Sequence, residues 1–236
     1  FGMLIGLTMI GLFALLPPML QNIYGYTVFD SGALLAPRGI GILFGMVIAG
    51  RLITKVDIRG IIFTGFSLVA LSIWMMTGWA IEMGTSHFIT VGLVQGLGMG
   101  MTFMPTNVIA FSTLSPAVRT DASSLLYLAR SLGGSLGISI FVTMLTRNMQ
   151  ISHEELAGRI TASSFTVVDP STADRFGSLG EAMLQVMDLE INRQAAMIAY
   201  LSDFQLLFYM VLAFLPLVLI LRPAKPGIDP TPQMPD

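Results

Sequence analysis

Ionisable side chains inside long apolar runs are the residues of this sequence with the clearest potential for chemistry. Arg38 and Arg130 lie well inside such runs, and Asp203 stands at the start of another. A charge at that depth in a bilayer is costly, so it typically binds a ligand, pairs with another group or couples to an ion. The alternative for each arginine is structural, because a guanidinium can snorkel or bind backbone carbonyls. We expect Asp203 to form an ion pair with Arg38 if their helices pack together.

Residues suited to binding apolar molecules occur in two neighbouring runs. Methionine adapts its shape and aromatic rings attract cations, which suits small hydrophobic or cationic substrates. The alternative is ordinary packing or contact with lipid, although a buried amide needs a polar partner in either case. The candidate substrate-binding residues are Arg38, Gln95, Met99, Phe103, Asn107, Tyr127 and Arg130.

Other kinds of chemistry lack the residues that they need. The chain has no cysteine, and its two histidines fall in expected loops, so no metal site is predicted. No serine has a base in its own run, and paired carboxylates are absent there, so we expect neither an enzyme nor a cofactor. The 12 Lys and Arg residues are scattered and the net charge is -2, which argues against a nucleic-acid partner.

The elements that carry these residues are apolar runs long enough to cross a bilayer. Hydrophobic residues make up 54% of the chain, charged residues 11%, and the mean hydropathy is +0.77, which is typical of an integral membrane protein. We predict an all-α bundle of six transmembrane helices, with Pro105 breaking the fourth near its end. The expected spans are about 1–20, 31–52, 60–81, 88–114, 122–146 and 203–221.

The connecting segments predict the orientation of the bundle. Lys and Arg occur in the second and fourth connections and after the last span, whereas the first and third connections have none. Such residues accumulate in the cytoplasm, so both ends of this segment are expected there. The polar stretch 147–202, which carries some helical patterns, is then an extracytoplasmic loop, and the Pro-rich tail 222–236 is predicted to be disordered. Because the chain begins inside an apolar run without methionine, we expect a fragment.

Glycines recur every fourth residue in three of the runs. This spacing lines one face of a helix with small residues and lets another backbone approach closely. The contacts it predicts serve either static packing or helices that slide during transport. The repeats are Gly41 and Gly45, Gly92, Gly96 and Gly100, and Gly133 and Gly137.

A short basic motif follows the second expected span. Its residues are Gly50, Leu52, Lys55, Asp57 and Arg59. The motif resembles the degenerate copy, in the C-terminal half, of the loop motif of major facilitator superfamily transporters. The acidic position of that motif is occupied by Thr54 here, which puts the charge lock of the family in doubt.

Further segments resemble the fourteen-helix drug:proton antiporter branch of the same superfamily. They are 16–18, 24–26, 122–125, 129–137 and 199–204. The resemblance implies that the six spans form the C-terminal bundle and that the N-terminal half, with two linker helices, is missing. It also implies a periplasmic adaptor protein as a possible partner.

The sequence therefore predicts part of a proton-driven transporter in the bacterial inner membrane. We expect a multidrug or small-molecule exporter that works by alternating access, with its substrate site between this bundle and the absent one. The alternatives are a transporter of a specific metabolite or siderophore with the same fold, and a membrane scaffold or receptor that does not transport. No Asp or Glu lies deep in a predicted span, so unless Asp30 or Asp203 serves in a proton relay, proton coupling is expected in the missing half.

Overall fold

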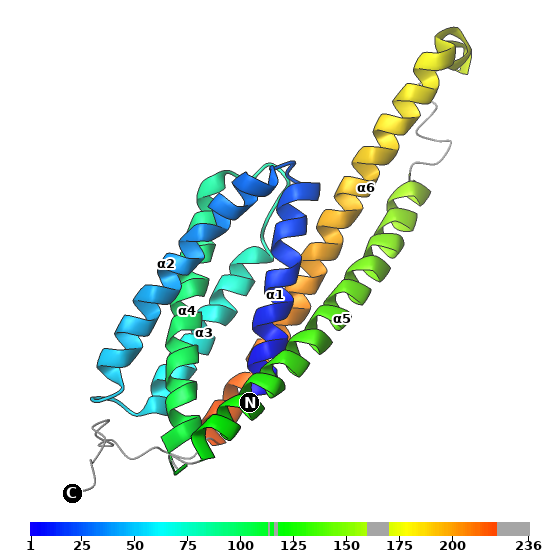
Figure 1. Ribbon diagram of the computed structural model, residues 1–236. Coiled ribbons are helices and arrows are strands. Elements are labelled where there is room, and N and C mark those ends of the chain that lie inside the picture. Colours follow the sequence, from blue (N-terminus) through cyan, green and yellow to red (C-terminus); the bar gives the residue numbers. More distant parts are fainter. Residues whose placement is uncertain (113, 116–117, 160–169, 221–236) are drawn as a thin grey trace, which may run out of the picture.

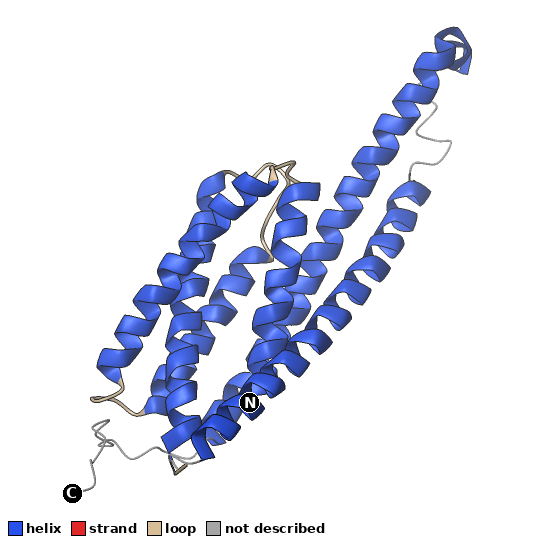
Figure 2. Ribbon diagram, in the orientation of Figure 1, coloured by secondary structure: helices blue, strands red, loops and turns tan. Residues whose placement is uncertain are grey.

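A computed structural model describes residues 1–112, 114–115, 118–159 and 170–220 of the chain. The regular structure in these ranges is helical (Figures 1 and 2). The elements are α1 (Gly2–Asn22), α2 (Val28–Leu52), α3 (Ile58–Met76), α4 (Thr85–Ser112), α5 (Arg119–Arg159), α6 (Pro170–Phe214) and the short 3-10 helix η3 (Leu215–Ile220).

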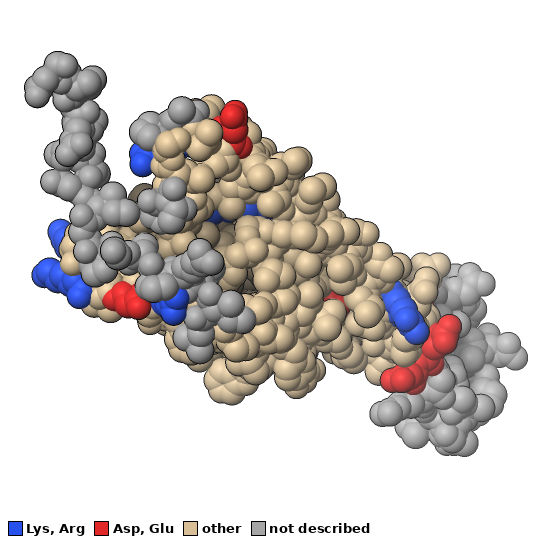
Figure 3. All heavy atoms as spheres, turned by 90° about the horizontal axis from the view of Figure 1, so that it is seen from below, with Lys and Arg blue, Asp and Glu red and all other residues tan. Residues whose placement is uncertain are grey.

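The helices form the bundle of a membrane protein. Six of them, among the described residues, are long and apolar enough to cross a bilayer. Lys, Arg, Asp and Glu side chains gather mostly toward the two ends, and a broad belt with few such side chains lies between them (Figure 3). This distribution suits a hydrocarbon surround, because an exposed apolar belt is favourable in lipid and costly in water. The prediction of an all-α bundle of six transmembrane helices is confirmed.

Polar residues fix where two of the helices begin. The Oγ1 atom of Thr27 accepts a hydrogen bond of 3.1 Å from the backbone N–H of Asp30, at the start of α2. Asp57 accepts one of 3.0 Å from the N–H of Arg59, at the start of α3. Each side chain satisfies a backbone donor that the first helical turn leaves free.

The expected end of the third span and the expected break in the fourth were wrong. The third span was expected to reach residue 81, but α3 ends at Met76, shortly before Gly78, and the chain then turns inward. The turn buries Trp79, whose ring centroid lies 4.9 Å from that of Phe88 and 5.9 Å from that of Phe204. The fourth helix continues through Pro105 to Ser112, so the expected break is absent.

The stretch 147–202 is mostly helical where it is described. α5 continues to Arg159 and α6 begins at Pro170, so the two helices extend beyond the rest of the bundle (Figure 1). Their polar faces meet where His153 lies 3.4 Å from Asp188. The expected sixth span is therefore part of a longer helix. The side of the membrane on which the extensions of α5 and α6 lie stays a prediction. The predicted disordered tail, 222–236, lies outside the described residues.

Glycine contacts hold the closest helix pairs together. α2 packs along α4, α1 along α5, and α3 along α4. A Cβ atom at Gly96 would collide with the carbonyl oxygen of Arg38, and one at Gly98 would lie 2.6 Å from the carbonyl oxygen of Gly65. Backbones this close leave room for a hydrogen atom alone in place of a side chain. The recurrence of glycine at every fourth residue predicts such contacts.

An apolar core fills the space between these pairs. Packing of complementary side chains, rather than hydrophobic transfer, holds helices together in lipid. Fully buried members from three helices include Leu12, Leu16 and Met19 of α1, Phe66 and Ile73 of α3, and Phe204 and Leu207 of α6. The polar side chains described next are held within this frame.

Candidate functional site

Arg38 is buried near the middle of the bundle. It comes ten residues after the start of α2 at Val28, or about 15 Å along the helix axis. Only 3% of its surface is exposed. Its guanidinium carbon lies 4.7 Å from the centroid of the Phe13 ring on α1, a cation–π contact. Helix α2 thus directs a cation at an aromatic face of its neighbour.

The expected ion pair between Arg38 and Asp203 does not form. The Nε and Nη1 atoms of Arg38 are buried without a hydrogen-bond partner, as are both carboxylate oxygens of Asp203. The physical reason is the packing of the helices that carry them. α6 packs mainly on α5 and α3, whereas α2 packs mainly on α4.

Asp203 lies deeper than its place in the sequence suggested. The Nε atom of Arg193 donates a hydrogen bond of 2.8 Å to the carbonyl of Ile23, so this part of α6 lies beside the end of α1. Asp203 comes ten residues later, about 15 Å further along the helix, and is fully buried. The expectation that Asp203 begins the last span, and that no acidic residue lies deep in this half, was wrong.

Gln95 is a second fully buried polar residue at a similar depth. It comes ten residues after the start of α4 at Thr85, and neither its Oε1 nor its Nε2 atom has a hydrogen-bond partner in the described part of the chain. Its neighbour Gly96 packs against the backbone of Arg38, which places the two polar residues at one level. Met99, one turn further on, is fully buried in the apolar core.

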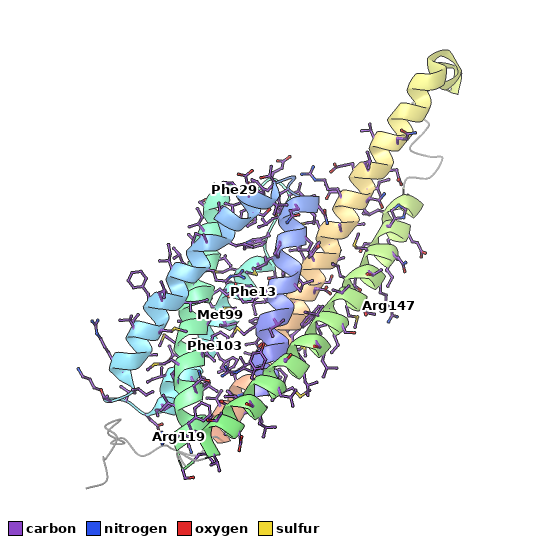
Figure 4. All side chains as sticks on the ribbon, in the orientation of Figure 1. Phe13, Phe29, Met99, Phe103, Arg119 and Arg147 are labelled. Carbon is purple, nitrogen blue, oxygen red and sulfur yellow. The ribbon has the colours of Figure 1, made fainter. Side chains whose placement is uncertain are left out.

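Arg130 brings three predicted residues together. Its Nη2 atom donates a hydrogen bond of 2.8 Å to Oδ1 of Asn107, and its guanidinium carbon lies 5.5 Å from the centroid of the Phe103 ring. Both partners belong to α4, so the arginine links α5 to α4. Figure 4 labels Phe103 on α4 and Phe13 on α1, with Phe13 nearer the end that holds the α1–α2 connection.

Tyr127 and the residues of the basic motif lie away from the two arginine contacts. Tyr127 is 75% exposed and does not join the arginine contacts. The residues of the basic motif lie at the end of α2, in the turn and at the start of α3, where Asp57 caps α3. The structure thus gives Asp57 a local role in helix initiation.

Phe13 is the residue of this site that the sequence did not reveal. It is 25 residues from Arg38 along the chain and 43% exposed. A phenylalanine in an apolar helix looks like any packing residue. Its contact with Arg38 appears once the register between α1 and α2 is known.

Comparisons with known proteins agree with this architecture. The sequence profile described as Major Facilitator Superfamily matches residues 1–138. The chain is 27% identical over 214 residues to the fatty acid resistance protein FarB of Neisseria gonorrhoeae, covering 90% of this chain and 42% of that protein. It is 34% identical over 148 residues to the multidrug export protein EmrB of Escherichia coli K12, covering 62% of this chain and 29% of EmrB. For the probable multidrug resistance protein EmrY of the same organism, the identity is 28% over 221 residues, or 92% and 42% of the two chains.

The chain is thus shorter than these relatives. Its matches cover between 29% and 42% of their lengths.

Proposed function

The chain belongs to the Major Facilitator Superfamily, and on that premise we propose that it is the C-terminal portion of a proton-driven multidrug or small-molecule exporter. The observation that carries the proposal is a six-helix bundle, matched to this family, that holds buried guanidinium nitrogens of Arg38 and Arg130 without hydrogen-bond partners. Charged groups in such places are typical of substrate or ion pathways. The names of two relatives, the multidrug export protein EmrB and the probable multidrug resistance protein EmrY, support the same function.

The site would lie between this bundle and a second bundle supplied by the rest of the protein. Transport would proceed by alternating access, in which one bundle rocks against the other around a central site. The α4 residues Gln95, Phe103 and Asn107 would contact small hydrophobic or cationic substrates, whereas Arg38 and Arg130 would bind substrate groups that accept hydrogen bonds. The proton gradient would supply the energy, with coupling residues in the other half.

The cellular arrangement is also a proposal. The chain is a multi-pass membrane protein, which we place in the bacterial inner membrane. The Lys and Arg residues of its connections favour an orientation with both ends of this segment in the cytoplasm. The α5 and α6 extensions would then lie on the periplasmic side. A periplasmic adaptor protein is a plausible partner there, and co-purification with the full-length protein under mild detergent tests it.

A transporter of one metabolite, or a scaffold that does not transport, has less support. The relatives with multidrug names favour export of diverse compounds. A scaffold would gain nothing from buried donors that lack partners, because such groups lower stability.

Dye efflux from cells tests the proposed function. Cells that express the full-length protein should expel a hydrophobic cationic dye faster than cells with an empty vector. Efflux should stop when an uncoupler collapses the proton gradient. Equal dye retention in both strains, for dyes of several charges and at confirmed expression in the membrane, would contradict the proposal.

A further inference from the structure

Arg38 and Arg130 make the same kind of contact with different helices. The guanidinium of Arg38, on α2, lies over the Phe13 ring of α1, and that of Arg130, on α5, lies over the Phe103 ring of α4. The distances to the ring centroids are 4.7 and 5.5 Å, both within the range of a cation–π contact. α2 therefore meets α1 as α5 meets α4.

The glycine contacts place the two pairs in one register. A Cβ atom at Gly96 would collide with the carbonyl oxygen of Arg38, and one at Gly6 would collide with that of Arg130. α4 therefore approaches the backbone of the first arginine in the way that α1 approaches the backbone of the second.

The spacing along the chain repeats as well. Phe13 follows Gly6 by seven residues, and Phe103 follows Gly96 by seven residues. The glycines after each arginine show common offsets of three and seven residues, with Gly41 and Gly45 after Arg38, and Gly133 and Gly137 after Arg130. Each of these glycines packs on the backbone of the partner helix.

Helices α1–α2 and α4–α5 are thus two copies of one arrangement. They run in opposite senses, because the α1–α2 and α4–α5 connections lie at opposite ends of the bundle (Figure 1). Along α4, Arg38 is level with Gly96, whereas the Arg130 guanidinium reaches Phe103 and Asn107, seven and eleven residues further on. The Arg130 guanidinium therefore lies about 10–16 Å along α4 from the level of the Arg38 backbone.

The two copies differ at one position that matters for charge. Asn107, eleven residues after Gly96, accepts a hydrogen bond of 2.8 Å from Nη2 of Arg130. The equivalent residue, eleven after Gly6, is Pro17, whose side chain offers no acceptor. Arg38 consequently lacks the partner that its counterpart has.

Arg38 therefore has binding capacity that the bundle leaves unused. Its Nε and Nη1 atoms are buried and unpartnered, and the arginine is only 3% exposed. Within the described ranges the ion pairs join His153 to Asp188 and Arg193 to Glu190, so no carboxylate of this part of the chain pairs with Arg38. A buried guanidinium recovers its lost hydration from an anion that accepts two hydrogen bonds.

We propose that Arg38 binds the carboxylate group of an amphipathic organic anion, and that Phe13 covers this anion site when it is empty. The inference rests on the proposed transport function and deepens it, since it assigns a class of substrate. The 43% exposure of Phe13 allows its ring to swing aside without displacing the glycine-packed backbones. Arg130, already held by Asn107, is the weaker counterpart at the other level.

Binding to the full-length protein tests the anion site. Radiolabelled naphthoate is compared with uncharged naphthamide and with the cation tetraphenylphosphonium, for the wild type and for Arg38→Gln, Arg38→Lys and Pro17→Asn. Gln removes the charge, Lys keeps it, and Asn supplies Arg38 with the acceptor that Arg130 has. Wild type should bind naphthoate more tightly than naphthamide. Arg38→Gln and Pro17→Asn should each weaken naphthoate binding about tenfold or more, with tetraphenylphosphonium unchanged and Arg38→Lys intermediate.

Several results would overturn the inference. The first is equal wild-type affinity for naphthoate and naphthamide, and the second is unchanged naphthoate binding in Arg38→Gln. The third is an equal loss of affinity for naphthoate and for tetraphenylphosphonium in Arg38→Gln, which would indicate that Arg38 pairs with an acidic residue elsewhere in the full-length protein. If Arg38→Gln does not fold, the Pro17→Asn result decides in the same way. The predicted binding pattern in a protein that drives no proton-dependent efflux would support the anion site and overturn only the exporter function.

Discussion

Buried polar atoms without partners are concentrated on a few side chains of this bundle. They include atoms of Arg38, Gln95, Arg130 and Asp203. Most buried polar groups in folded proteins form hydrogen bonds, and each exception lowers stability. Their presence at depth in an otherwise apolar frame is what a binding function would require and what packing alone would not.

The bond between Arg130 and Asn107 gives a test at this scale. Replacing Asn107 by Ala removes the acceptor and leaves the Nη2 atom of the half-buried Arg130 guanidinium without this partner. The free energy of unfolding should fall by about 1–3 kcal/mol, as expected for a hydrogen bond to a charged group. Thermal unfolding in detergent measures the change. Tyr127→Ala, at a residue that is 75% exposed, is the control and should change little, and equal effects of both substitutions would count against the role of the bond.

Tyr24, in the connection between α1 and α2, gives a pH-dependent test. Its hydroxyl donates a hydrogen bond of 2.8 Å to the carbonyl of Ala80. Burial, aided by Tyr26, raises the pKa of Tyr24 from 10.0 to about 12. Since the folded state favours the neutral phenol, the stabilisation is complete below pH 10 and is lost as the pH rises to about 12.

The free energy of unfolding, measured from neutral pH to about pH 12, checks whether the stabilisation by Tyr24 falls as the pH rises. Tyr24→Phe should be less stable than wild type at neutral pH, and the difference should narrow above pH 10, the usual pKa of the group. A difference that stays constant over this range would show that the hydroxyl group contributes nothing that titrates.

At the scale of helices, close glycine packing fixes how α2 meets α4 and how α1 meets α5. A Cβ atom at Gly96 would collide with backbone, which cannot move aside as a flexible side chain can. Gly39, on α2, has open space around its missing side chain. The two glycines therefore form a matched pair for mutation.

Gly96→Ala should separate α2 from α4 and lower both folded yield and melting temperature. Gly39→Ala should be neutral or stabilising by up to about 1 kcal/mol, because alanine favours the helix more than glycine does. Size-exclusion profiles and melting curves of the two variants make the comparison. Gly96→Ala with wild-type stability would mean that the helices are less closely packed than we describe.

The extensions of α5 and α6 allow a test by cross-linking. The chain contains no cysteine, so the pair His153→Cys and Asp188→Cys adds the only two thiols of this segment. The native side chains lie 3.4 Å apart, and a short bifunctional thiol reagent should link their replacements readily. Lys55→Cys with Asp188→Cys, from opposite ends of the bundle, should not link. If the pair at residues 153 and 188 does not link either, the helices do not run side by side there.

The sequence predicted features that depend on local composition and missed those that depend on register between helices. The six spans could be predicted from apolar runs, and the glycine contacts from the recurrence of glycine at every fourth residue. The depth of Asp203 was missed because the polar residues before it suggested a loop, whereas they lie on a continuous helix beside α5. The bond between Arg130 and Asn107 joins residues 23 positions apart, and no local pattern indicates it.

For the whole molecule, the proposed function makes the bundle described here one part of a larger transporter. The relatives it matches are more than twice its length. The deep position of Asp203 makes it the acidic residue of this half to examine for coupling. If coupling lies in the other half, as we predict, Asp203→Asn should leave the ratio of protons to substrate unchanged in transport assays. An uncoupled variant would instead assign coupling to α6.

The most direct test of the exporter function is transport by the purified full-length protein in liposomes with an imposed pH gradient. The account predicts that substrate crosses the membrane against its concentration gradient when protons can move the other way, and that transport ceases when the pH gradient is abolished. Substrate movement that is indifferent to the direction and size of the pH gradient would contradict it.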